Sequence, residues 1–320
     1  MNFKNILIVL GEPYSTFSEI IGKCFDGKRK YKNKIILIGS VKLLNKQLKE
    51  LGYRINFNIV NNISEAKRNI VNIINIDLDF NKSFKNISSE SNRYIKKSFN
   101  MALDILKKNK HNTILINGPI SKKTFLKKKY SGITEYLSMK TKSKGEVMLI
   151  YNKNLSVSPL TTHTPIKYVT KNITKRKILE NISKINKFYK QTLKKKCHIA
   201  VLGLNPHCET TSKYSEEEKI IIPSLNILKK RGIKIKGPFS ADTFFLNKNI
   251  NKYDVVVGMY HDQVLTPIKT LFNFNAINIT IGLPFIRISP DHGPNSGMVG
   301  KNKSDPSSLI YAIEFIEKLN

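Results

Sequence analysis

Short apolar runs alternate with longer helical stretches along this 320-residue chain, and the alternation constrains the fold more than any other feature. Most runs are apolar at every position, which is typical of strands that are buried on both faces. Strands are predicted at Ile6–Leu10, Ile35–Ile38, Thr113–Ile116, Val147–Tyr151, Ser156–Leu160, Ile199–Leu204, Val255–Met259 and Asn278–Ile281. Helices are predicted at Val41–Leu51, Ser89–Lys108, Lys175–Lys195, Glu216–Arg231 and Pro306–Leu319. The pattern indicates an α/β fold with a mostly parallel sheet.

Three local signals mark the ends of predicted helices. Ser40 directly precedes the first predicted helix, and serine is a favourable N-cap. Gly232 follows the helix at Glu216–Arg231, where a glycine commonly ends a helix. The Lys- and Asn-rich segment Asn81–Asn92 is predicted to be a surface loop that runs into the start of the next helix.

The chain is strongly basic, with 55 Lys and Arg residues against 23 Asp and Glu residues and a net charge of +32. The lysines are spread over the whole chain, so we interpret the charge as a generally basic surface. Such a surface also attracts anionic, phosphorylated substrates. A nucleic-acid-binding protein is a distant alternative, because the sequence shows neither aromatic residues interleaved with bases nor a basic recognition helix.

Cysteine usage and hydropathy indicate the compartment. The three cysteines show no CxxC spacing, which argues against a disulfide framework and fits a reducing compartment. The N-terminal apolar run is too short for a signal peptide, and no segment approaches the roughly 20 apolar residues that a membrane helix needs. We therefore expect a cytoplasmic protein with no membrane partner.

Three of the six histidines share one setting, because His163, His207 and His261 each follow the carboxyl end of an apolar run. In open α/β sheets, ligands bind at this edge. Three neutral imidazoles from three strand ends suit one divalent first-row metal ion, with positions left open for substrate. The alternative is three separate loop histidines, each with its own backbone partner.

Polar residues near the third histidine add to the candidate site. Asp262 and Gln263 directly follow His261, and metal-bound histidines usually need such an acceptor nearby. Asp242, within GPFSADTF, is another isolated acid, for which a helix or turn cap is the alternative.

Three further polar residues surround the last apolar strand, with Lys269 and Arg287 flanking it and Asn278 beginning it. This combination fits an acidic small molecule, since arginine can bind a carboxylate or phosphate with two hydrogen bonds. In a protein this basic, a single base is more often solvated surface, so the interpretation depends on clustering with His261.

Common nucleotide-binding signatures are absent. The segment GEPYSTFSE at residues 11–19 follows the first strand without a G-x-G-x-x-G pattern, and no GxxxxGK[ST] occurs. The sequence therefore argues against a conventional Rossmann or P-loop site.

A set of motifs in a fixed order resembles the 4-hydroxythreonine-4-phosphate dehydrogenase family of pyridoxal phosphate biosynthesis. The set consists of GEP (11–13), NGPISK (117–122), TEYL (134–137), TTHTP (161–165), LNPH (204–207), KGPFSADTFF (236–245), MYHDQ (259–263), NITIGLPFIR (278–287) and DHG (291–293). The resemblance implies a two-lobed isocitrate/isopropylmalate dehydrogenase-like fold with an active-site cleft between the lobes. Residues 1–125 and 285–320 would form the first lobe, and 126–284 the second, on the metal and dimer side.

The resemblance also implies roles for single residues. His163, His207 and His261 match the three metal ligands of the family, for one divalent ion such as Zn, Mg or Co. The matching substrate-binding positions are Thr134, Lys269, Asn278 and Arg287, and the catalytic candidates are Asp262, Asp242 and Lys269. His292, Gly293 and Asp305 lie in a stretch similar to the cofactor loop of the wider group, and would bind NAD or NADP. A homodimer with an active site shared between subunits is expected.

The implied reaction is oxidation of 4-phosphooxy-L-threonine to 2-amino-3-oxo-4-phosphooxybutanoate, which decarboxylates to 3-amino-2-oxopropyl phosphate. Two departures from the family pattern bear on it. Ile133 stands where a histidine usually precedes Thr134, and the segment GEPYSTFSE at residues 11–19 stands where a glycine-rich loop is usual. The first departure favours an alternative, a sister dehydrogenase acting on threonate or erythronate 4-phosphate. The second motivates another, a catalytically idle relative.

Overall fold

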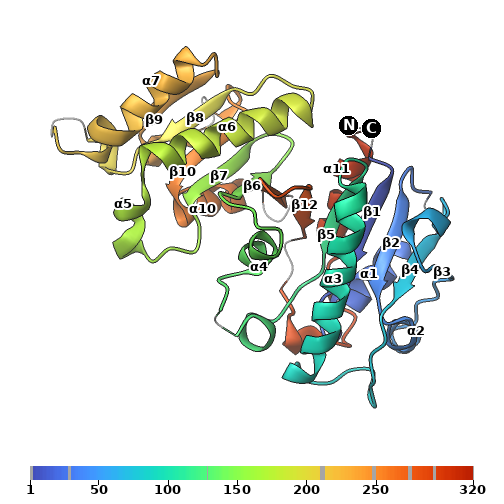
Figure 1. The fold of residues 1–320 in the computed structure, drawn as a ribbon. Helices are drawn as coiled ribbons and strands as arrows, with labels where there is room; N and C mark the ends of the chain where they lie inside the picture. Colours follow the sequence, from blue (N-terminus) through green and yellow to red (C-terminus); the bar gives the residue numbers. More distant parts are fainter. Residues whose placement is uncertain are drawn as a thin grey trace. The chain divides into compact units, whose positions relative to one another are not determined.

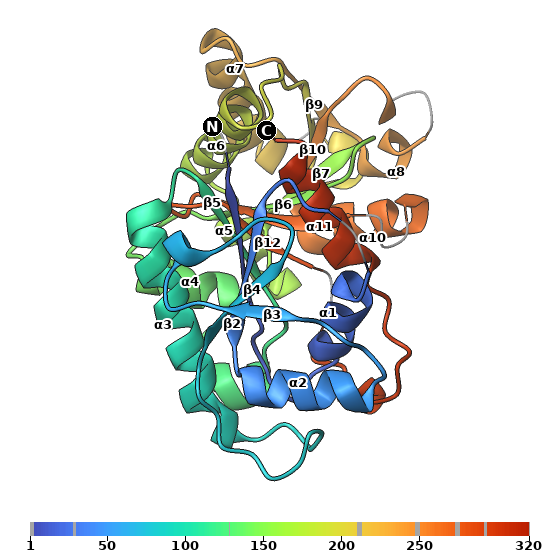
Figure 2. The same ribbon diagram turned by 90° about the vertical axis from the view of Figure 1, so that its right-hand side faces the viewer.

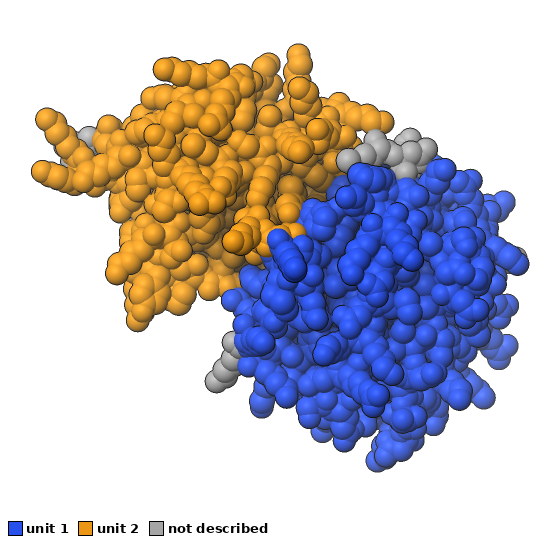
Figure 3. All heavy atoms as spheres, in the orientation of Figure 1, with its two compact units in different colours: residues 1–142, 283–320 blue, residues 143–282 orange. Residues whose placement is uncertain are grey.

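The chain divides into two compact units in a computed structural model that describes residues 3–27, 30–127, 129–209, 213–246, 250–272, 276–290 and 293–319. Unit 1 comprises Met1–Lys142 and Leu283–Asn320, and unit 2 comprises Ser143–Gly282 (Figure 3). Each unit is described by itself, with the strands and helices that it contains.

Six described strands form the sheet of unit 1, and every pair among them runs parallel, in the order β3-β4-β2-β1-β5-β12. The strands are β1 (Asn5–Val9), β2 (Lys34–Gly39), β3 (Phe57–Ile59), β4 (Val71–Asn75), β5 (Thr113–Asn117) and β12 (Arg287–Ser289). The helices are α1 (Phe17–Phe25), α2 (Val41–Glu50), α3 (Asn92–Asn109), α4 (Ile133–Lys140) and α11 (Ser307–Glu317). Helix α3 covers one face of this sheet, and α1 and α11 cover the other (Figures 1 and 2).

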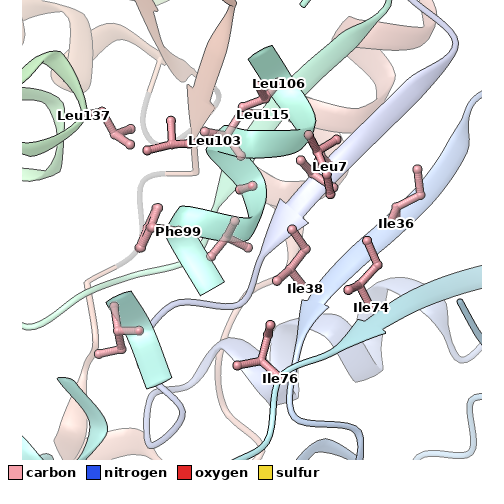
Figure 4. Close-up of a cluster of buried hydrophobic side chains, with 14 of the residues drawn as sticks. Leu7, Ile36, Ile38, Ile74, Ile76, Phe99, Leu103, Leu106, Leu115 and Leu137 are labelled. Carbon is pink, nitrogen blue, oxygen red and sulfur yellow. The ribbon is translucent and has the colours of Figure 1, made fainter. Parts of the chain in front are cut away.

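The core of unit 1 lies between the sheet and α3. Leu7, Ile36 and Ile38 project from neighbouring strands towards Phe99 and Leu103 of α3 (Figure 4). Every residue of β1 and β5 is buried, as expected for central strands that are covered by helices on both faces.

The sheet of unit 2 is mixed, with the described order β11-β6-β7-β10-β8-β9. The run β7-β10-β8-β9 is parallel, whereas β6 is antiparallel to both β7 and β11. The strands are β6 (Val147–Tyr151), β7 (Ser156–Thr161), β8 (Ile199–Leu202), β9 (Ile235–Phe239), β10 (Val255–Tyr260) and β11 (Ile277–Ile281). The helices are α5 (Val169–Asn172), α6 (Lys175–Gln191), α7 (Ile222–Lys230), α8 (Ala241–Phe244) and α10 (His261–Phe272). Helices α6 and α7 pack on one face of this sheet and α10 on the other (Figure 1).

The predicted α/β fold with mostly parallel strands is confirmed, and each predicted strand and helix has a counterpart. The Ser40 hydroxyl accepts a hydrogen bond from the Leu43 backbone at 3.4 Å, so it caps α2 as predicted. Gly232 follows α7 with a φ of +77°, a conformation that favours glycine. The short strands β3, β4, β9 and β12 and helices α1, α4 and α10 were not predicted, because their sequences are brief, polar or merged with motif loops.

The boundary between the units differs from the expected one. Residues 126–142 were expected in the second lobe, yet Leu126, Tyr136 and Leu137 pack with Phe99 in the core of unit 1. This apolar contact places α4 in unit 1, so the chain crosses into unit 2 after Lys142 and returns at Leu283. Among the residues that the structure describes, no helix has both the length and the apolar character to cross a membrane.

Candidate active site

Three neighbouring parallel strands of unit 2 present their carboxyl ends at the same sheet edge. His163 follows β7 by two residues, and His261 directly follows β10 as the first residue of α10. His207 lies in the short turn Pro206–Cys208 after β8. Since β10 pairs with both β7 and β8, the three histidines leave three adjacent strands at one edge.

The structure brings two of these histidines together. The rings of His163 and His261 have centroids 6.4 Å apart, and Asp262 Oδ1 lies 2.6 Å from His261 Nδ1. His207 instead has its Nδ1 3.7 Å from Asp242 Oδ2, and its side chain is 82% exposed. Within the described ranges, no three His, Cys, Asp or Glu side chains are close enough to hold a metal ion. The three-histidine ligand set therefore stays a prediction.

Asp242 is one of the two candidate catalytic acids, and its surroundings affect its pKa. Asp242 is exposed in α8, where it accepts a hydrogen bond from Ser240. That hydrogen bond and the nearby His207 hold the pKa of Asp242 below its ordinary value. Asp242 therefore lies beside His207, one of the three predicted metal ligands.

A buried arginine connects two polar side chains of unit 1. Arg287 in β12 is 2% exposed, and its Nε donates to Asn117 Oδ1 at 2.7 Å. One terminal nitrogen donates to Thr134 Oγ1 at 2.9 Å, so two predicted substrate-binding residues touch each other. Burial lowers the pKa of Arg287 to about 10, while the charge of Glu135 opposes that shift. The role of Arg287 in substrate binding stays a prediction.

The remaining predicted substrate-binding residues lie in unit 2. Lys269 is exposed on α10, two helical turns after His261. Asn278 lies in β11, and its Oδ1 is buried without a hydrogen-bond partner among the described residues. A buried acceptor of this kind is costly unless a ligand supplies a donor, so Asn278 is suited to substrate binding.

The predicted cofactor residues are only partly described. His292 lies outside the described residues, and Gly293 is exposed. Asp305 Oδ1 accepts hydrogen bonds from both the backbone N–H and the hydroxyl of Ser307, the first residue of α11. The loop after Gly293 lines a pocket of about 530 Å³ in unit 1, together with residues 86, 87, 121, 123 and 124. That volume is within the range of cofactor sites.

Three residues support these sites, and of them only Gln263 was expected near the site, as an acceptor beside His261; Asn117 and Glu217 had no predicted role. Asn117 begins NGPISK and orients Arg287, while Gln263 ends MYHDQ and bridges two strand ends. Glu217, in a run of three acids, accepts hydrogen bonds from the turn that carries His207. Only the buried positions of Asn117 and Glu217, which the sequence does not show, separate them from ordinary surface residues.

The comparisons with known proteins decide the family. The family model of the pyridoxal phosphate biosynthetic protein PdxA matches residues 31–316. The chain belongs to the PdxA family. This confirms the resemblance drawn from the motifs, and with it the expectation of an oxidoreductase.

PdxA relatives match over almost the whole chain. The 4-hydroxythreonine-4-phosphate dehydrogenase of Sulfurihydrogenibium sp. (strain YO3AOP1) is 37% identical over 316 residues, or 97% of this chain and 96% of that protein. The enzyme of the same name from Aquifex aeolicus (strain VF5) is 34% identical, covering 99% and 98%. The crystal structure of 4-hydroxythreonine-4-phosphate dehydrogenase from Klebsiella pneumoniae has a TM-score of 0.86 at 25% identity, covering 99% of both chains.

The first-strand loop is where this PdxA chain departs from the glycine-rich pattern. Tyr14 and Phe17 are each 1% exposed, so bulky rings fill space around the loop. Gly11 keeps a φ of +75°, and a Cβ there would lie 2.4 Å from the Pro119 carbonyl oxygen. Glu12 is also buried, beside a cavity of about 20 Å³. The loop is tightly packed, and it encloses one ionisable carboxyl group.

Glu12→Gln should stabilise the protein above pH 6. Burial raises the pKa of Glu12 from 4.5 to about 6, against a weaker opposing effect of the Tyr14 backbone N–H. The folded state therefore holds this proton more tightly than the unfolded state, and the stability it contributes is present below pH 4.5 and lost as the pH rises through 6. At about 1.4 kcal/mol per pKa unit, we expect Glu12→Gln to gain about 2 kcal/mol at pH 8 over the wild type.

Urea unfolding at pH 4, 6 and 8 measures this difference. Asp104→Asn, which removes an exposed carboxylate of α3, is the matched control and should show no comparable gain at pH 8. A gain for Glu12→Gln that is equal at pH 4 and pH 8 would show that the buried charge is not its cause.

Proposed function

We propose that the chain oxidises 4-phosphooxy-L-threonine to 2-amino-3-oxo-4-phosphooxybutanoate with NAD or NADP, and that the product decarboxylates to 3-amino-2-oxopropyl phosphate. The observation that carries the proposal is the placement of His163, His207 and His261 at the carboxyl ends of three adjacent parallel strands. The full-length match to relatives named 4-hydroxythreonine-4-phosphate dehydrogenase supports the choice of substrate.

The donor chemistry of the three histidines fits a divalent metal ion. Imidazole nitrogens suit zinc or cobalt better than magnesium, which prefers oxygen ligands, so zinc and cobalt lead our three candidates. When bound, such an ion supplies Lewis-acid polarisation of the secondary hydroxyl of the substrate. Asp262 would orient the His261 ring by accepting a hydrogen bond from it, since Asp262 Oδ1 lies 2.6 Å from His261 Nδ1.

A base must remove the hydroxyl proton as hydride passes to the nicotinamide. Asp262 and Asp242 are the carboxylate candidates, and the hydrogen bond from Ser240 holds the pKa of Asp242 below its ordinary value. Lys269 would bind a negative group of the substrate or take part in proton transfer. Each of these groups is exposed on unit 2 and accessible to a substrate.

Anionic groups of the substrate would be bound by the basic and amide side chains. Arg287, oriented by Asn117 and Thr134, supplies a fixed positive charge in unit 1. Asn278 and Lys269 supply a hydrogen-bonding amide and a second positive charge in unit 2. The pocket beside Gly293 is our proposed cofactor site, and from the sequence we propose His292 and Asp305 as cofactor-binding residues. We further propose a cytoplasmic homodimer whose active site is shared between subunits, as in the family.

Formation of NADH from 4-phosphooxy-L-threonine tests the proposal. The absorbance of NADH is followed before treatment with a chelator, after it, and after divalent metal ions are added back. We expect turnover to fall by more than tenfold on chelation and to return with zinc or cobalt. Turnover that chelation leaves unchanged would contradict the metal site, and an absence of NADH from a folded protein would contradict the substrate.

A sister activity on threonate or erythronate 4-phosphate is a second candidate, and Ile133 favours it. Ile133 is the first residue of α4, next to Thr134, and packs against the core of unit 1. An apolar side chain at this position offers no hydrogen bond to a substrate amino or hydroxyl group. The ratio of kcat/KM for the amino and hydroxy substrates decides between the two activities.

A further inference from the structure

The turn that carries His207 has an unfavourable backbone conformation. His207 has a φ of +54° and Cys208 a φ of +56°, so two consecutive residues with side chains adopt the left-handed region. Such conformations are uncommon for residues other than glycine and persist only where the surroundings hold them. A group outside the turn must therefore fix it.

Glu217 is the group that holds the turn. It lies in the short helix Glu217–Ile221 that precedes α7, and it is completely buried. Its Oε1 accepts from the backbone N–H groups of Leu204 and Asn205 at 2.6 and 2.9 Å, and its Oε2 accepts from Asn205 Nδ2 at 2.7 Å. Buried carboxylates are retained only with such partners, so the charge is matched to this turn.

The side chain of Gln263 connects the same turn to the strand of His261. Its Nε2 donates to the Gly203 carbonyl oxygen at 2.7 Å, and its Oε1 accepts from the Met259 backbone N–H at 2.7 Å. Gly203 permits this packing, because a Cβ there would lie 2.9 Å from Glu217 Oε1. The ends of β8 and β10 are thus tied by one amide, next to two of the proposed ligands.

We propose that Glu217 is a positioning residue that sets where His207 stands at the edge of the unit 2 sheet, with Gln263 linking its turn to His261. The proposal rests on the metal site proposed above. Glu217 would not contact the ion. It would act through the turn that carries His207, as residues that hydrogen-bond to metal ligands and orient them do. Loss of its charge leaves the peptide donors of the turn poorly paired, and His207 loses its fixed place.

Glu217→Gln tests the role with a nearly isosteric change. The amide nitrogen of the new glutamine side chain would replace one carboxylate oxygen and would face N–H groups that now donate to that oxygen. The Asn205 amide could not compensate by flipping, because its oxygen would then face the carboxylate of Glu216, which now accepts from Asn205 Nδ2 at 2.9 Å. We expect Co²⁺ affinity, measured by equilibrium dialysis, to fall about 10- to 100-fold, the usual effect of losing an outer-shell partner. The visible absorption spectrum of bound Co²⁺ should change as well, which a purely structural role would not cause.

Glu218→Gln is the matched control, since it removes an exposed carboxylate from the next residue of the same helix. It should bind Co²⁺ as the wild type does. Hydrogen exchange at the Leu204 and Asn205 amides gives a readout that needs no metal, and we expect faster exchange in Glu217→Gln alone. Wild-type Co²⁺ affinity and spectrum in Glu217→Gln would overturn the positioning role.

The outcome for the wild type separates this inference from the proposed function. The proposed metal site predicts that the wild type binds Co²⁺ and that His207→Ala loses this binding. If His207→Ala binds as much Co²⁺ as the wild type, or if the wild type binds none, the proposed metal site is contradicted. The anchoring of the turn is then decided by amide exchange alone, and unchanged exchange at Leu204 and Asn205 in Glu217→Gln would overturn it too.

Discussion

His261→Ala should lower kcat by about a thousandfold or more and leave the fold intact. Metal-assisted catalysis contributes several kcal/mol of transition-state stabilisation, and each 1.4 kcal/mol or so changes the rate about tenfold. His261 begins α10 with its side chain 35% exposed, and the core of unit 2 lies under later residues of that helix such as Val264 and Ile268. Truncation of the ring therefore removes a ligand without opening a cavity in the core.

The measurement is steady-state NADH formation, together with bound Co²⁺ and the circular dichroism spectrum. His198→Ala is the matched control, because His198 is an exposed histidine at the opposite, amino end of β8 and bonds to Asp254 through its backbone N–H and carbonyl groups. This control should keep wild-type turnover. A His261→Ala enzyme with near-normal kcat would exclude the proposed metal role.

The strands that carry the histidines were predictable because they are buried on both faces. A central parallel strand such as β10 must be apolar throughout, so Val255–Met259 stands out from the polar sequence around it. The end of such a run is also the ligand-binding edge of the sheet, which makes a histidine just beyond it informative. The placement of His163, His207 and His261 just past strand ends follows from these two rules, whereas the adjacency of the three strands comes from their pairing in the structure.

The residues that support the site were not predictable in the same way. Glu217 is one of three consecutive glutamates, and nothing in the sequence distinguishes it from Glu218, which is exposed. Asn117 ends β5, but its partner Arg287 is 170 residues away. Such pairings depend on which side chains tertiary packing buries, and periodicity carries no information about them. The same reason explains why α4 was expected in the second lobe. Only its packing against Phe99 shows that it lies in unit 1.

Arg287→Lys should reduce kcat/KM by about a hundredfold, mainly through a higher KM. The guanidinium donates from two different nitrogens to Asn117 and Thr134, a fixed fork that an ammonium group on a shorter side chain does not reproduce. Each hydrogen bond to a charged group is worth about 1.5–3 kcal/mol, so the loss of one substrate contact accounts for the expected change. Because Arg287 is 2% exposed, we also expect a loss of stability of about 3 kcal/mol from the two internal bonds.

Kinetics and urea unfolding, each measured on the same preparations, separate binding from folding for this variant. Arg231→Lys, an exposed arginine just after α7, is the matched control and should change neither. Thr134→Val removes only one acceptor of the fork, so its effect on KM should be smaller, and combining it with Arg287→Lys should add less than the sum of the two. Full additivity would mean that Arg287 and Thr134 act on the substrate independently, and an unchanged KM in Arg287→Lys would mean that this buried charge serves the fold of unit 1 alone.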